Sequence, residues 1–247
     1  MSNNVQGFEY EEVVISALLE AGYCGDITEG AGSSAADADA DLRLGDDKYL
    51  VEVKKDSQAQ MGGTSVRFVD GEFELASETV DSVTAEMIIS ALEPKKDAIK
   101  NFLSFIGAEQ FPTTCEKSAW EQAKVGGLLK QMNAKISRDT SFIADHYKSK
   151  GIYYIQIGGA GLFYLSDNPA NLPIPKLEGS IDIELRAGRS GSKKNAAGVP
   201  VVSGLLRAQG RLKFQGQSPY TLDDSDSVRA MVIDWTGDRW KGLVSDR

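Results

Sequence analysis

Residues 41–54 constrain the fold of this 247-residue chain more than any other segment. Apolar residues alternate with polar ones on both sides of the turn residues 45–47, a pattern typical of two short strands joined as a hairpin. Side chains two residues apart on a strand point to the same face of a sheet. Glu52 and Lys54 are therefore expected to project together from the face opposite Val51 and Val53.

A carboxylate upstream is expected to reach the same spot. Asp37, Asp39 and Asp41 alternate with alanines, and we expect Asp41, the nearest to the strand, to be the essential one. Two carboxylates beside an ammonium favour a hard cation, and Mg²⁺ is commonly held by one or two carboxylates, water and phosphate oxygens.

The chemistry that follows from such a cluster is hydrolysis of a phosphodiester. A bound metal activates a water and stabilises the charge that develops on the phosphate. Lys54 would orient or deprotonate that water. The pattern predicts a Mg²⁺ site, in which Mn²⁺ substitutes, with the metal held by Asp41, Glu52 and the Val53 carbonyl. The alternative for a lone Glu-x-Lys is an ordinary solvent-exposed hairpin edge.

Asp41, followed by the apolar run 49–51 and by Glu52-Val53-Lys54, resembles the motif of the PD-(D/E)XK nuclease superfamily. Ala40 stands where the motif's name-giving proline would be. Residues 7–23 are similar to the first helix of archaeal Holliday-junction resolvases. In that family a glycine precedes the helical catalytic glutamate by four residues and a Gly-aromatic pair closes the helix, offsets that fall on Gly7, Glu11 and residues 22–23.

This resemblance covers about residues 5–63 and implies further roles. Glu11 would be a third carboxylate acting on the metal directly or through water, although Glu9 and Glu12 lie beside it. A glutamine after the Glu-x-Lys would hold the water or the DNA backbone, and Gln58 and Gln60 are the candidates; ordinary polar loop residues are the alternative. Ser33 and Ser34 lie where the resolvases carry a Gly/Ser-rich active-site loop.

The charge distribution points to a nucleic-acid partner despite a net charge of −9. Residues 1–93 hold 20 acidic and 5 basic residues, whereas residues 94–247 hold 16 acidic and 22 basic ones. Residues 186–213 contain seven basic residues and no acidic one, and we expect this stretch to contact DNA phosphates. Within it, residues 189–195 are predicted to form a flexible basic loop. The seven are Arg186, Arg189, Lys193, Lys194, Arg207, Arg211 and Lys213. A solvated loop is the alternative.

The expected fold class is α/β, with a restriction-endonuclease-like mixed sheet flanked by helices. Residues 1–78 would form the N-terminal part of the nuclease core with the metal site. Residues 79–150 read as a helical insertion, and residues 151–247 as a β-rich part that completes the core and contacts DNA. Whether these segments make one domain or two stays open.

The predicted function is a Mg²⁺-dependent DNA endonuclease. It would be either structure-specific, cutting junctions or branched DNA, or of the restriction type; a catalytically silent nucleic-acid-binding protein on the same fold is the alternative. Cutting both strands implies a symmetric homodimer. Two cysteines, no signal peptide and no apolar run of membrane-spanning length predict a cytoplasmic protein. The acidic composition and compact size are compatible with a protein of a bacterium or a phage-infected cell.

Overall fold

The computed structural model describes residues 3–24, 38–56, 60–75 and 82–245 as a mixed α/β protein with two sheets. The chain divides into two compact units, which are described separately. Unit 1 comprises residues 1–59, 138–181 and 212–247, and unit 2 comprises residues 60–137 and 182–211. These units cut across the three consecutive segments predicted from the sequence, because two long strands each contribute residues to both.

The sheet of unit 1 has four strands in the order β1-β2-β7-β8. These are β1 (Ala40–Leu44), β2 (Asp47–Lys54), β7 (Ile152–Ile157) and β8 (Gly161–Tyr164). β1 and β2 form the predicted antiparallel hairpin, β2 runs parallel to β7, and β7 is antiparallel to β8. The sheet is therefore mixed, as the sequence predicted.

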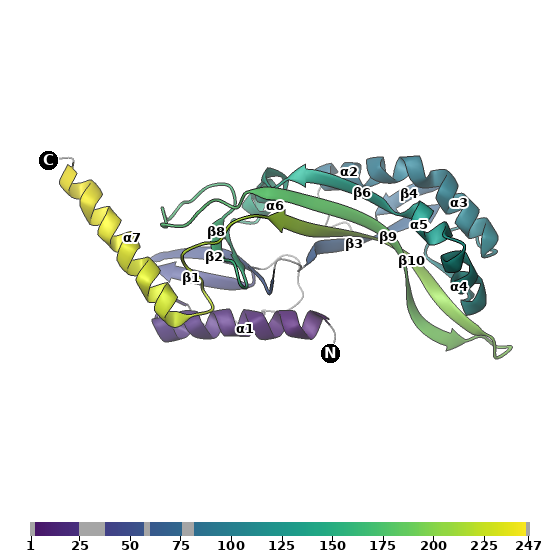
Figure 1. Ribbon diagram of the computed structural model, residues 1–247, viewed down its shortest axis with the longest axis horizontal. Helices are drawn as coiled ribbons and strands as arrows, with labels where there is room; N and C mark the ends of the chain where they lie inside the picture. The colour runs from purple at the N-terminus through teal and green to yellow at the C-terminus, as the bar shows by residue number, and fades with distance from the viewer. Residues whose placement is uncertain (1–2, 25–37, 57–59, 76–81, 246–247) are drawn as a thin grey trace. The chain divides into compact units, whose positions relative to one another are not determined.

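Helix α1 (Asn3–Ala21) lies along β1 and β2 (Figure 1). Val14 and Leu18 are fully buried in a core shared with Leu42, Val51 and Val53 from the sheet. The helix ends as predicted at Gly22, whose φ of 84° suits glycine, and the N–H of Tyr23 bonds back to the Leu18 carbonyl at 2.9 Å.

Two more helices complete unit 1. α7 (Ser225–Ser245), which the sequence reading did not predict, adds Val228, Met231 and Trp235 to the α1 side of the core. α6 (Ser141–Ser149) begins after Thr140, whose N–H and hydroxyl bond the carbonyls of Gly179 and Leu177. α6 contacts the side chain of Glu52, which points away from the α1 face, so the sheet has helices on both faces.

The sheet of unit 2 is built mainly from antiparallel strands in the order β4-β3-β10-β9-β6, with β5 also paired to β10. The strands are β3 (Gln60–Val69), β4 (Glu72–Leu75), β5 (Thr113–Glu116), β6 (Ala134–Asp139), β9 (Gly179–Lys194) and β10 (Pro200–Phe214). β3 and β4 form an antiparallel hairpin around residues 70–71.

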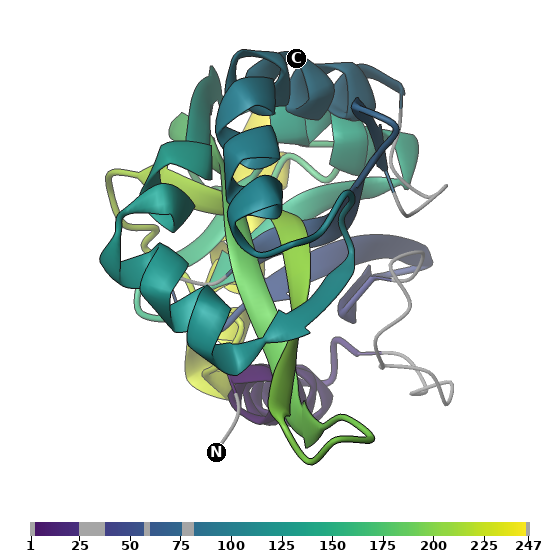
Figure 2. The same cartoon turned by 90° about the vertical axis from the view of Figure 1, so that its right-hand side faces the viewer.

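Short helices gather along this sheet (Figures 1 and 2). They are α2 (Ser82–Leu92), the 3₁₀ turn η1 (Glu93–Lys95), α3 (Lys96–Phe105), α4 (Lys117–Val125) and α5 (Leu128–Met132). Phe102 stacks on Phe111 and meets Trp120 edge-on, and Trp120 covers Gly204 of β10. A side chain at position 204 would collide with that ring, so glycine there permits the close packing.

Two sequence expectations for this part of the chain were wrong. The region predicted as a helical insertion also contains β5 and β6, which are too short to show a clear alternation. Around Trp120 the chain forms two helices, α4 and α5, divided at Gly126–Gly127, where Gly127 has a φ of 80°. Residues 189–195 are not a flexible loop, because β9 continues to Lys194 and β10 begins at Pro200.

Candidate active site

Asp39, Glu52 and Lys54 meet where β1 begins and β2 ends. The Lys54 ammonium contacts Glu52 Oε1 directly and lies 3.7 Å from Asp39 Oδ2. Asp39 Oδ2 also accepts a hydrogen bond of 2.8 Å from the Val53 backbone N–H, which fixes this carboxylate against β2. The side chains of Glu52, Lys54 and Asp39 are 11%, 16% and 23% exposed, so the cluster is sheltered but open to solvent on one side.

The register of the hairpin explains why Asp39 belongs to this cluster. Leu44 pairs with Asp47 across a two-residue turn that begins at Gly45, and Ala40 pairs with Val51. Counting one residue further back places Asp39 opposite Glu52. The same counting is possible from the sequence once the turn is taken as two residues long, a length typical of hairpins with glycine in the turn.

Asp41, predicted as the essential carboxylate, lies elsewhere along the strand. It pairs with Leu50 in the ladder, two residues away from Glu52. Its carboxylate is 3.2 Å from the Lys48 ammonium and 3.5 Å from the Arg43 guanidinium, and accepts a bond from the Cys24 thiol. Burial opposes ionisation of Asp41, but these cations outweigh it and lower its pKa. Asp39 takes the position that the sequence analysis gave to Asp41.

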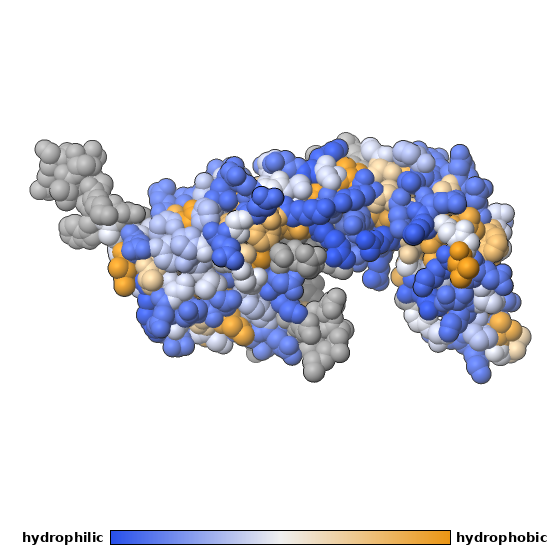
Figure 3. Space-filling model, viewed as in Figure 1, coloured by the Kyte–Doolittle hydropathy of each residue, from blue (hydrophilic) through white to orange (hydrophobic). Residues whose placement is uncertain are grey.

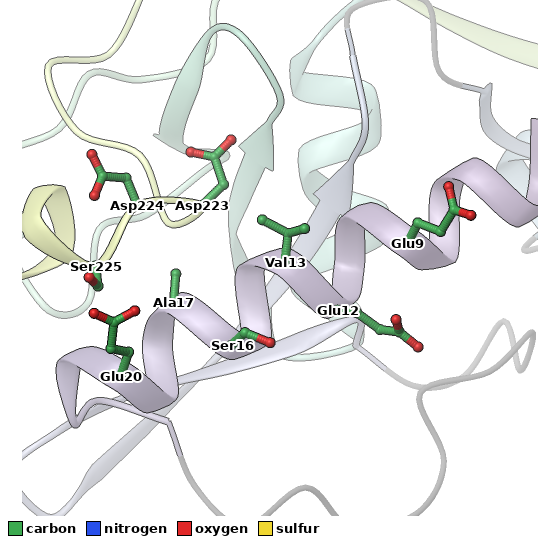
Figure 4. Close-up of a pocket in the computed structure, with 9 residues that line it drawn as sticks. All are labelled: Glu9, Glu12, Val13, Ser16, Ala17, Glu20, Asp223, Asp224 and Ser225. Atoms are coloured by element: carbon green, nitrogen blue, oxygen red, sulfur yellow. The ribbon is translucent and has the colours of Figure 1, made fainter.

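Glu11 is the α1 glutamate that faces the cluster. The charges of Asp39, Lys54 and Glu52 all act on it. Glu9 and Glu12 instead line a groove of about 530 Å³ between α1 and residues 223–225, on another side of the helix (Figure 4). The choice among the three glutamates, which the sequence leaves open, therefore falls on Glu11.

The electrostatics of the cluster reflect crowded carboxylates in a partly dry environment. Burial, reinforced by Asp39 and Glu52, raises the pKa of Glu11 from 4.5 to about 6. Burial and the charge of Glu52 also raise the pKa of Asp39, although Lys54 and the Val53 N–H oppose this. For Lys54 burial acts against the charged form, but Glu52 and Asp39 outweigh it and raise its pKa, so Lys54 is an ammonium at neutral pH.

Tyr147 of α6 is a contact of this cluster that sequence reasoning missed. Its hydroxyl donates a 2.9 Å hydrogen bond to Glu52 Oε1, and burial followed by the Glu52 charge raises its pKa well above the ordinary value. The two residues are separated by 95 positions in the chain. Tyr147 lies in an ordinary amphipathic helical stretch, so no local pattern indicates this contact.

The donor set suits a small hard cation. Within the described ranges, no group of three or more His, Cys, Asp or Glu side chains is arranged to enclose a metal ion. Mg²⁺ needs less than that, since one or two carboxylates with water and substrate oxygens suffice. Asp39 and Glu52 supply two carboxylates at one point, and the Val53 carbonyl predicted as a ligand belongs to the strand residue between Glu52 and Lys54.

The remaining predicted site residues near the motif are only partly described. Gln60 is the first residue of β3, where its backbone pairs with Arg211 of β10. Gln58, Ser33 and Ser34 lie outside the described residues.

The seven basic residues predicted to contact DNA differ in their surroundings. Arg186 and Arg211 pair with Glu184, and Arg189 pairs with Glu121 at 2.6 Å, so these three side chains have carboxylate partners. Lys213 is exposed in β10.

Lys193, Lys194 and Arg207 are exposed and have no ion pair with any residue in the described part of the chain. The first two lie at the tip of the β9–β10 hairpin, where the Asn195 side chain accepts bonds from the N–H groups of Ala197 and Val199 and so holds the turn. The face shown in Figure 3 is largely hydrophilic, with scattered apolar patches.

None of the helices in the described part of the chain combines the length and apolar character needed to cross a lipid bilayer. Comparison of the chain with models of known protein families, with curated proteins and with solved structures finds no match. The resemblance to PD-(D/E)XK nucleases therefore stays a prediction from the residues.

Proposed function

We propose that the protein is a Mg²⁺-dependent DNA endonuclease whose active site is formed by Asp39, Glu52 and Lys54. The observation that carries this proposal is the convergence of two carboxylates and an ammonium, largely shielded from solvent, at the end of a hairpin. The mixed sheet between α1 and α6 supports the finer proposal of a restriction-endonuclease-like core.

Asp39 and Glu52 would hold the metal. When bound, Mg²⁺ supplies an activated water and offsets charge on the phosphodiester. The Val53 N–H keeps Asp39 oriented toward β2. Lys54 forms ion pairs with both carboxylates, and its ammonium would offset negative charge near the substrate phosphate. Glu11, at the edge of the cluster, would orient water or accept a proton from it.

DNA contact is proposed for the β9–β10 hairpin. A site made of carboxylates repels phosphate, so the binding energy for the DNA backbone has to come from cations elsewhere. Lys193, Lys194 and Arg207 are exposed cations that no described carboxylate neutralises, which makes them better candidates than the paired Arg186, Arg189 and Arg211.

Two features of the sequence suggest two different classes of DNA substrate. The first helix favours a structure-specific enzyme that cuts junctions or branched DNA, and the long dissimilar remainder favours a restriction-type enzyme. Double-strand cutting by either would use a homodimer, since each site cuts one strand. We propose that it acts in the cytoplasm of a bacterium or phage-infected cell.

The experiment is to incubate the purified protein with linear, supercoiled and four-way-junction DNA, with Mg²⁺ or with EDTA. Discrete fragments from long duplex DNA indicate a restriction-type enzyme, and symmetric nicks at a junction indicate a resolvase. Glu52→Gln is the control against a contaminating nuclease, because it keeps the shape of the side chain and removes its charge. DNA binding without cleavage in any condition would contradict the proposal and support the silent binder.

A further inference from the structure

The candidate site receives a contact from the face of the sheet that α1 does not cover. Tyr147 and Glu52 are both buried, and Glu52 Oε1 accepts a hydrogen bond of 2.9 Å from the Tyr147 hydroxyl. The helix that carries Tyr147 is anchored at its start by the two bonds of Thr140 and by the buried side chains of Ile143 and Ala144. Tyr147 thus reaches Glu52 from a fixed backbone.

Both hydrogen-bond donors to Glu52 use the same oxygen. Lys54 Nζ and the Tyr147 hydroxyl both contact Oε1. A carboxylate oxygen has two lone-pair positions, so two donors satisfy Oε1. Oε2 is then the Glu52 oxygen with lone pairs available to another ligand.

We propose that Tyr147 is a positioning residue that fixes the Glu52 carboxylate so that Oε2 alone is presented to the divalent cation. This inference rests on the proposed function, since it concerns the same metal site. Tyr147 does not contact the cation or the substrate; it acts through Glu52. Outer-shell partners of metal ligands of this kind typically change metal affinity or activity 10- to 100-fold when they are removed.

A purely structural tyrosine provides the matched control. Tyr154 of β7 is also fully buried, and its hydroxyl bonds Asn168 at 2.9 Å and accepts the Ala170 N–H at 2.9 Å. Its side chain lies in the core on the α1 side of the sheet, away from Glu52. Tyr154→Phe and Tyr147→Phe both remove one buried phenolic oxygen, but only the second removes a bond to a candidate metal ligand.

The test measures Mn²⁺ binding in the absence of DNA, by the loss of the free-ion signal in electron paramagnetic resonance. Tyr147→Phe is expected to weaken Mn²⁺ binding about 10- to 100-fold, whereas Tyr154→Phe binds like the wild type even if it unfolds at a lower temperature. Raising Mg²⁺ should restore cleavage by Tyr147→Phe. Wild-type affinity in Tyr147→Phe would overturn this inference and leave the proposed function standing. A wild type that binds no Mn²⁺ would overturn both.

Infrared difference spectra of the wild type provide a second measurement that needs no Tyr147 variant to fold. Coordination through one oxygen widens the separation between the two carboxylate stretching bands, and coordination through both oxygens narrows it. Mg²⁺ should widen the separation for Glu52, assigned as the bands that Glu52→Gln lacks. A narrowed separation would overturn the inference.

Discussion

Replacing Glu11 with glutamine should stabilise the protein at neutral pH. The folded state raises the pKa of Glu11 from 4.5 to about 6, mainly by burial and then by the charges of Asp39 and Glu52. Between these two values the folded protein keeps a proton that the unfolded chain has released. The contribution of Glu11 to stability is therefore fully present below pH 4.5 and is lost as the pH rises through about 6.

The size of this effect follows from the same shift. The difference in pKa corresponds to about 2 kcal/mol at neutral pH, and because Glu11 is only half-buried, screening by solvent reduces it to about 1 kcal/mol. Glu11→Gln removes the ionisation, so the free energy of unfolding of the variant minus that of the wild type should grow by about 1 kcal/mol between pH 4 and pH 7.

Urea unfolding of both proteins at these two pH values, without metal, measures that difference. Glu12→Gln is the control, because Glu12 lies on the same helix but lines the groove beside residues 223–225. The free energy of unfolding of Glu12→Gln minus that of the wild type should change less between pH 4 and pH 7. An equal change in the two variants, or a variant of Glu11 that loses stability at pH 7, would refute the placement of Glu11 among the site carboxylates.

Three further predictions concern other parts of the chain. Lys54→Ala should lower the cleavage rate by about two to four orders of magnitude, and normal cleavage by the folded variant would exclude Lys54 from the site. Neutralising Lys193 and Lys194 together should weaken binding to all DNA sequences alike and flatten the dependence of log K on log salt by about 0.9 for each lost contact; an unchanged slope would contradict hairpin binding. Gly158→Ala should strongly lower the unfolding temperature, because the added carbon would lie 1.9 Å from the Lys55 carbonyl oxygen, whereas Gly188→Ala, which meets no atom within 4 Å, should not.

The sequence was sufficient for features that depend on local periodicity. The β1–β2 hairpin, the common direction of Glu52 and Lys54, and the end of α1 at Gly22 are all set by residues close together in the chain. The sequence analysis chose Asp41 rather than Asp39 as the carboxylate beside Glu52, because Asp39 and Asp41 have the same parity along the strand. Only the cross-strand register distinguishes them.

Contacts between residues far apart in the chain could not be predicted from local sequence patterns. Tyr147 meets Glu52 because β2 and β7 pair in parallel and α6 crosses the face of that sheet. The pairing of Arg189 with Glu121, which neutralises one predicted DNA contact, likewise joins distant segments within unit 2. A count of basic residues along residues 186–213 therefore overestimated the number of cations available to phosphate.

The most direct test of the proposed active site compares Asp39→Asn with Asp41→Asn. Both variants remove one carboxylate charge from the same segment, but only Asp39 lies opposite Glu52 and beside Lys54. Cleavage of DNA in Mg²⁺ by Asp39→Asn should fall to the level seen with EDTA, and Asp41→Asn should retain most of the wild-type rate. Loss of cleavage in Asp41→Asn, with Asp39→Asn still active, would contradict the site described here.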